Sequence, residues 1–158
     1  MTWRAAPRDA LHLLLVAVVA AACGGGSPAT STATPEPSPS PQGISVTMQA
    51  VGGSGVTGTA VVTKGSGSFT VKLTLTGMKA SSQHANHIHK GSCAKAGPID
   101  KSLQTISADA SGAGTATTTV PGDFAIPAEG WYVNVHTGPD ITQPGQGAPV
   151  ACGDIPAS

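Results

Sequence analysis

The chain has 158 residues and a formal net charge of zero, with 8 basic and 8 acidic residues. Both of its arginines, Arg4 and Arg8, lie near the start, and aromatic residues make up only 3% of the chain. Nucleic-acid-binding domains carry clustered positive charge and commonly use arginine. We therefore exclude nucleic acid as a partner.

The first 22 residues have the layout of a secretory signal peptide, with a basic head followed by an apolar run over 11–22. The run is shorter than the roughly 20 apolar residues that a membrane span needs. Three alanines before Cys23 resemble a bacterial lipobox, which predicts that Cys23 is acylated and anchors the mature protein to a membrane. The alternative is plain secretion after cleavage at an Ala-x-Ala site. Both interpretations predict an extracytoplasmic protein, at the cell surface or in the periplasm.

Residues 23–42 consist of Gly, Ser, Thr, Ala, Pro and a few others, with Glu36 as the only charge. A segment of this composition cannot bury enough apolar surface to offset its ordering entropy. It is therefore predicted to be a disordered linker. The remaining residues, 43–158, are enough for one domain.

This domain reads as all-β. Seven short segments rich in Val, Thr and Ile are separated by glycine-rich and serine-rich turns, and no window shows sustained helical periodicity. This pattern is typical of a β-sandwich or a flattened barrel. The predicted strands are 44–51, 56–63, 69–76, 84–90, 103–108, 114–120 and 131–137.

Cys93 and Cys152 are the two cysteines of the domain. Outside the cytoplasm two cysteines permit one intramolecular pairing, so a disulfide is the default expectation. A role as metal ligands is the alternative, but neither cysteine belongs to a CxxC motif or has a second thiol nearby in the sequence.

Residues 84–93 read HANHIHKGSC and hold three of the chain's five histidines. Alternate residues of a strand face the same side. If Ile88 faces the core, His87 and His89 both face away from it, and the same argument turns His136 outward when Val135 faces inward. Neutral imidazole is a good ligand for copper and zinc. On its own, however, a His-x-His spacing is more often a chance feature of a solvated strand.

Three motifs favour a metal site over a chance spacing. HANHIHKGSC, together with GWYVNVH and the terminal ACGDI, resembles the copper/zinc superoxide dismutase superfamily, whose secreted bacterial members carry related stretches in the same order. WYVNVHTGP is closer still to the related CHRD domains, named after chordin. The resemblance covers about residues 55–155 and depends on the order of the motifs rather than on any single one.

The resemblance implies a Greek-key β-sandwich or flattened barrel of the Cu/Zn superoxide dismutase type. It implies that His87, His89 and His136 are copper ligands. His84 corresponds to a histidine that braces the copper strand and does not bind metal. Cys93 and Cys152 correspond to the family's intrachain disulfide, in agreement with the cysteine count.

The sequence also departs from that family. Residues 94–130 contain no histidine, so the ligand that bridges copper and zinc is missing and no zinc site of the family type is expected. Pro149 stands where the family has its active-site arginine, although Lys90 or Lys95 could partly substitute for that charge. We therefore expect an extracytoplasmic copper-binding lipoprotein with weak superoxide dismutation or none. The alternative is a non-catalytic CHRD-like surface module without metal.

Overall fold

The computed structural model describes residues 43–157. The signal peptide predicted for 1–22, the linker predicted for 23–42 and the acylated Cys23 lie outside the described residues and stay predictions. The described part consists of strands joined by turns and loops, and none of it forms a helix long and apolar enough to cross a membrane. The strands are β1 (Ile44–Ala50), β2 (Thr57–Lys64), β3 (Ser68–Thr76), β4 (Gln83–Gly91), β5 (Ala96–Ser107), β6 (Gly114–Pro121), β7 (Trp131–His136) and β8 (Pro149–Ile155).

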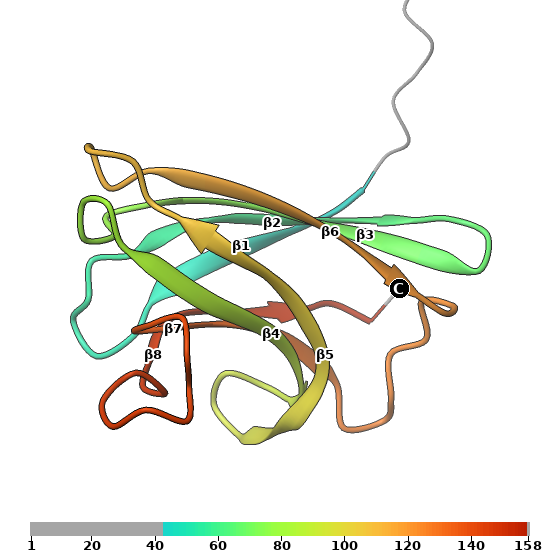
Figure 1. Cartoon of the computed structure of the whole chain (residues 1–158). Helices are drawn as coiled ribbons and strands as arrows, with labels where there is room; N and C mark the ends of the chain where they lie inside the picture. The colour runs from blue at the N-terminus through green and yellow to red at the C-terminus, as the bar shows by residue number, and fades with distance from the viewer. Residues whose placement is uncertain (1–42, 158) are drawn as a thin grey trace, which may run out of the picture. The chain divides into compact units, whose positions relative to one another are not determined.

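The strands form one antiparallel array in the order β5-β4-β7-β8-β1-β2-β3-β6. β1 turns the corner, because its first five residues pair with β2 whereas Gln49 and Ala50 pair with β8. The array therefore folds into two layers, as Figure 1 shows. β5 and β6 are the two end strands of the array. Between them, the backbone N–H of Gln104 on β5 donates to Thr118 Oγ1 on β6. The predicted all-β sandwich or flattened barrel is confirmed.

The alternation of β3 determines which of its faces is buried. Phe69, Val71, Leu73 and Leu75 are each at most 1% exposed, as the sequence predicts, while Lys72 points to solvent. From the other layer Ile88 on β4 and Val133 and Val135 on β7 pack against this face and are completely buried. The hydrophobic core therefore lies between the layers, and the histidine-bearing strands each present one face to it.

The structure has one strand more than the seven predicted. β8 was not predicted because PVACGDI lacks the run of β-branched residues that marks a strand. It pairs with β7 on one side and with β1 on the other. A side chain at Gly153 would collide with the Thr47 carbonyl and the Val46 and Met48 side chains, so this strand depends on glycine for its close packing. β5 also begins seven residues before the predicted 103, at Ala96.

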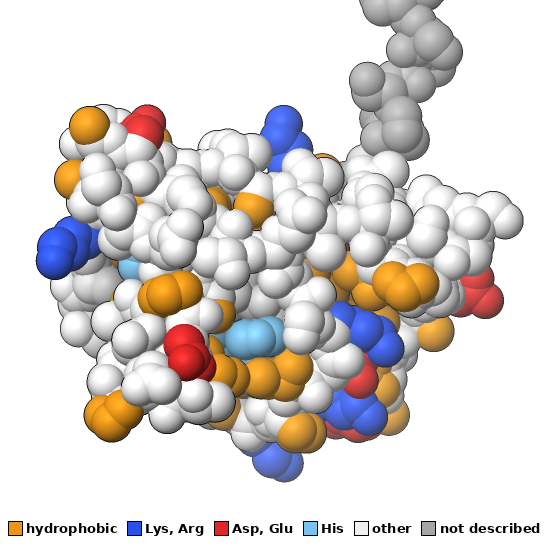
Figure 2. Space-filling view, in the orientation of Figure 1, with side chains coloured by type: hydrophobic (Ala, Val, Ile, Leu, Met, Phe, Trp, Pro, Cys, Tyr) orange, Lys and Arg blue, Asp and Glu red, His pale blue; other side chains and the backbone are white. Residues whose placement is uncertain are grey.

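The face of the domain shown in Figure 2 is dominated by neutral polar side chains and backbone, with lysines and acidic residues scattered among them. Residues 43–157 carry six lysines and six acidic residues, so neither sign of charge is in excess there. No extended field of one sign covers this face.

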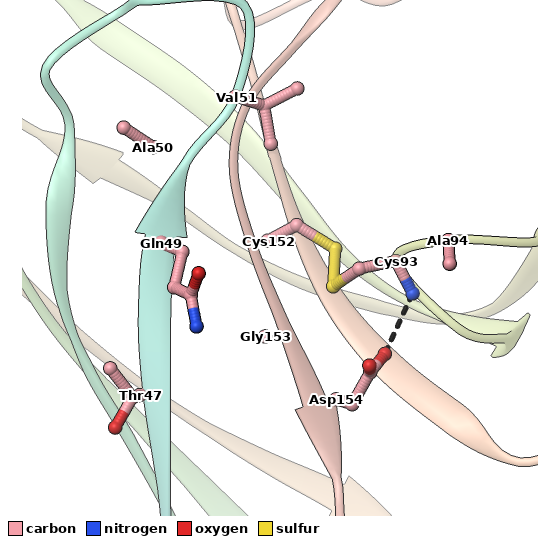
Figure 3. Close-up of a pocket in the computed structure, with 9 residues that line it drawn as sticks. All are labelled: Thr47, Gln49, Ala50, Val51, Cys93, Ala94, Cys152, Gly153 and Asp154. Atoms are coloured by element: carbon pink, nitrogen blue, oxygen red, sulfur yellow. Dashed lines mark hydrogen bonds between the residues drawn. A yellow bond between two sulfur atoms is a disulfide. The ribbon is translucent and has the colours of Figure 1, made fainter.

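Cys93 and Cys152 form a disulfide, as the cysteine count predicts. It joins the segment that follows β4 to the middle of β8 and lines a surface pocket (Figure 3). Next to it, the backbone N–H of Cys93 donates to Asp154 Oδ1 over 2.6 Å. The covalent bond and this hydrogen bond together fix the end of β4 against β8.

Reduction of this disulfide is expected to lower the free energy of unfolding by about 4 kcal/mol, because the bond closes a loop of 59 residues and restricts the unfolded chain. Urea denaturation with and without dithiothreitol measures the effect. The double variant Cys93→Ser/Cys152→Ser should have the stability of the reduced protein and should not respond to the reductant. Equal unfolding midpoints for the oxidised and reduced wild-type protein would contradict the prediction.

Candidate metal centre

The centre is built by the pairing of β4 with β7. In this antiparallel pair His87 lies opposite Asn134 and His89 lies opposite Tyr132, while Ile88 lies opposite Val133. Since alternate residues face opposite sides, the Ile88–Val133 pair enters the core and the histidine pairs lie on the outer face. His136, two residues beyond Asn134, lies on that same face.

The three imidazole rings lie next to one another on the outer face. The ring centroid of His87 is 5.1 Å from that of His136 and 5.8 Å from that of His89, and His89 and His136 are 5.7 Å apart. Each ring offers one ligand nitrogen, and these three nitrogens lie within 4.8 Å of one another. Imidazole nitrogens bind zinc or copper at about 2 Å, so two ligands of one ion lie at most about 4 Å apart. Small movements of the side chains would bring three nitrogens within 4.8 Å to that spacing.

Backbone carbonyls determine which nitrogen two of these rings offer. His89 Nδ1 lies 3.0 Å from the Gly97 carbonyl, and His136 Nδ1 lies 2.8 Å from the Gly147 carbonyl. A carbonyl can only accept a hydrogen bond, so each Nδ1 carries the proton and donates. In the neutral ring Nε2 then keeps its lone pair, which is the arrangement commonly found in metal-binding histidines.

Three of the four remaining nitrogens are buried and have no partner in the protein. His87 Nδ1, His89 Nε2 and His136 Nε2 are all buried and make no hydrogen bond. A buried polar atom without a partner costs about 1–3 kcal/mol, and three such atoms on three neighbouring rings are unusual in a folded protein. A bound cation would satisfy all three, so the residues present fit a metal ion.

His84 lies close to this group but is not available to an ion. Its Nδ1 lies 2.8 Å from the backbone carbonyl of His136, and its Nε2 lies 2.8 Å from Ser82 Oγ. Both ring nitrogens are therefore occupied. The first contact ties β4 to the end of β7 directly behind His136, which suits the bracing role that the sequence suggests.

The prediction that the histidines emerge on solvent-side faces is wrong in one respect. They do lie on the outer face, but His89 and His136 are only 8% and 5% exposed, and only His87 is partly exposed. The loop 137–148 and the start of β5 cover the site and contribute the Gly147 and Gly97 carbonyls. Figure 2 shows histidine side chain reaching the surface among hydrophobic and neutral side chains.

Burial also controls the charge of the site. Burial, together with repulsion by His136 and His89, lowers the pKa of His87 to about 4. The pKa of His136 is likewise lowered by burial, although the hydrogen bond to the Gly147 carbonyl partly opposes this. The rings of His87 and His136 are therefore neutral near neutral pH, which is the state that binds metal.

Two contributions to the site carry no signal in the sequence. The carbonyls of Gly97 and Gly147 belong to the backbone, and no side-chain pattern in the sequence marks them. Tyr132 stacks on the His89 ring, with centroids 5.1 Å apart and an angle of 29° between the planes. Because Tyr132 is 3% exposed, it packs against the site and is not part of an exposed binding surface.

Comparisons with known proteins agree with this fold. A family model described as the CHRD domain matches residues 42–140. A search of curated proteins finds no match.

Three solved structures share the fold. A Cu/Zn superoxide dismutase from Brucella abortus aligns with a TM-score of 0.55 and 23% identity, covering 72% of this chain and 99% of that one. A SOD-like protein from Bacillus subtilis aligns with a TM-score of 0.59 and 14% identity, again over 72% and 99% of the two chains. A double mutant of a SOD-like protein from Bacillus subtilis aligns with a TM-score of 0.57 and 13% identity, covering 75% of this chain and 100% of that one.

The metal-free protein is expected to lose stability as the pH falls from about 6.5 to about 4. The pKa of His87 is about 4 in the folded state against 6.5 for an ordinary histidine, so the unfolded chain takes up a proton that the folded chain rejects. The stabilising contribution is complete above about 6.5 and is lost as the pH approaches 4. Urea unfolding midpoints in the presence of a chelator measure the loss. His87→Gln should make the dependence shallower, and an unchanged slope would contradict this origin.

Proposed function

We infer that this chain, which belongs to the CHRD domain family, is an extracytoplasmic copper-binding protein. The observation that carries the proposal is the clustering of three imidazoles. Each offers one ligand nitrogen within 4.8 Å of those of the other two, and each has one buried nitrogen that makes no hydrogen bond. His87, His89 and His136 would hold the ion, and His84 would brace the strand that carries two of them.

The donor set fits copper or zinc, and the fold and the sequence motifs favour copper. Three imidazoles without a thiolate or a carboxylate suit copper or zinc. The two cysteines of the domain are bonded to each other and supply no thiolate. The fold is shared with a Cu/Zn superoxide dismutase, and the sequence resembles the copper motifs of that superfamily. When bound at three histidines, copper would supply one-electron exchange between Cu(I) and Cu(II).

The residues around the site support slow catalysis at most. Electrostatic guidance of an anionic substrate needs a positive field, and residues 43–157 contain no arginine and carry as many acidic residues as lysines. Lys90 is 4.0 Å from Glu129, which offsets its charge. The histidine that would link copper to a second metal has no counterpart in 94–130. We therefore propose copper binding as the main function and superoxide dismutation as a minor activity.

The location outside the cytoplasm is supported by the disulfide, because the cytoplasm of most cells keeps thiols reduced. The signal-peptide layout of 1–22 is consistent with export. We propose that a lipid on Cys23 anchors the protein to the membrane and leaves the domain free to meet extracytoplasmic copper.

The purified protein is expected to bind one equivalent of copper, and His136→Ala should lower the affinity by more than about 100-fold, because a ligand contributes more than the 10- to 100-fold of a bracing partner. Competition titration and electron paramagnetic resonance of the Cu(II) form measure this. His84→Gln is the matched control and should keep one ion and the same number of nitrogen ligands. Unchanged affinity in His136→Ala would remove this residue from the site. Wild-type protein that binds no copper would favour the metal-free surface module.

Superoxide dismutation by the copper-loaded protein is expected to be at least about 100-fold slower than the diffusion limit of about 10⁹ M⁻¹ s⁻¹, because neither arginine nor excess positive charge guides the anion. Pulse radiolysis measures the rate constant directly. His136→Ala loaded in the same way serves as the control for adventitious copper. A rate near the diffusion limit would overturn this part of the proposal.

A further inference from the structure

Asn134 has an unusual environment for a strand residue. Its side chain is 7% exposed, and its Oδ1 is buried without any hydrogen-bond partner. It lies on β7 between Tyr132 and His136, and alternate residues of a strand face the same side. Asn134 therefore lies on the outer face, where the three histidines meet.

Its neighbours across the sheet explain why the oxygen is unsatisfied. Asn134 lies opposite His87 on β4 and opposite Cys152 on β8. Side chains that are directly opposite in an antiparallel pair have Cβ atoms about 4.5–5.5 Å apart. Cys152 is part of the disulfide and has no hydrogen to donate, and His87 Nδ1 is itself without a partner. Neither neighbour supplies what an amide oxygen needs.

Five buried side-chain atoms lack partners among the described residues, and four of them lie on this one face. Three are the histidine nitrogens of the proposed copper site, and the fourth is Asn134 Oδ1. The fifth, Asn86 Oδ1, belongs to the opposite face of β4, where Asn86 lies across from the core residue Val135. Buried acceptors without donors are costly, and a single cation at the centre of the group would satisfy all four.

We propose that the side-chain oxygen of Asn134 is a fourth protein donor to the ion held by His87, His89 and His136. The proposal rests on the copper site proposed above and adds a preference between oxidation states. An oxygen donor is harder than imidazole and favours Cu(II), whereas Cu(I) prefers softer ligands. Asn134 thus stabilises the oxidised form of the bound metal.

The test replaces the amide without changing the size of the side chain. Asn134→Leu removes the oxygen and is expected to lower the Cu(II) affinity about tenfold while leaving the Cu(I) affinity unchanged. A tenfold loss confined to Cu(II) raises the reduction potential by about 59 mV. Asn134→Asp places a charged oxygen at the same point and is expected to raise the Cu(II) affinity above that of the wild type. Competition titrations with a Cu(II) chelator and a Cu(I) chelator, spectroelectrochemistry and electron paramagnetic resonance give independent readouts.

The metal-free protein provides a readout that a structural role would not reproduce. Since Asn134→Leu removes an unsatisfied buried acceptor, the melting temperature in the presence of a chelator should stay the same or rise, although metal binding weakens. Asn134→Val is a second apolar variant in case the leucine does not fit. Asn86→Leu is the matched control: it removes the same kind of atom from the core side of β4, together with a hydrogen bond to the Gln104 carbonyl. It should lower the melting temperature and leave the Cu(II)/Cu(I) preference unchanged.

The outcomes separate this inference from the proposal on which it rests. Wild-type protein that binds copper through the histidines, with equal Cu(II) affinity and equal spectra in Asn134→Leu, would overturn the role of Asn134 and leave the copper site intact. A parallel loss of Cu(I) and Cu(II) affinity with a lower melting temperature of the metal-free protein would show a structural role and would also overturn the inference. Wild-type protein without affinity for either ion would remove both proposals.

Discussion

The structure depends on the register between β4 and β7. Ile88 lies opposite Val133 and is completely buried in the core, so the residues on either side of Ile88 must face outward. Burial of Ile88 therefore fixes the direction of His87 and His89, and burial of Val133 and Val135 does the same for Asn134 and His136. A shift of one residue in either strand would turn the imidazoles into the core and the aliphatic side chains out of it. The hydrophobic effect thus positions the polar site.

The histidines on the outer face of β4 and β7 owe their charge state and their unpartnered nitrogens to partial burial. Burial keeps the pKa of His87 and His136 low, so their lone pairs are available at neutral pH, and it leaves three nitrogens without a hydrogen-bond partner in the protein. The metal-free protein bears the cost of those unsatisfied atoms. A site of this kind is stabilised when an ion binds, because the ion replaces interactions that folding removed. The same burial that weakens the metal-free fold favours binding.

Much of the fold follows from the local pattern of the sequence. The alternation from Phe69 to Leu75 predicts both β3 and its buried face. The same rule applied to Ile88 and Val135 places His136 on the outer face with His87 and His89, which are far from it in the chain. The rule does not predict β8, which becomes a strand by pairing with β7 on one side and with β1 on the other. It also does not predict the cover over the histidines, because the loop 137–148 has no periodicity. Nor does it predict that Asn134 lacks a hydrogen-bond partner, since this depends on the disulfide opposite it.

The two carbonyls that orient His89 and His136 belong to glycines, yet the two positions differ in how far they can change. A Cβ at Gly97 would overlap the carbonyl of Lys90, so any replacement would separate β5 from β4 and withdraw the acceptor from His89. A Cβ at Gly147 would lie 3.1 Å from the Ile141 carbonyl, a contact that a small shift of the loop relieves. A side chain at the first position therefore requires the two strands to separate, whereas the second position accepts one while its ring keeps the same tautomer.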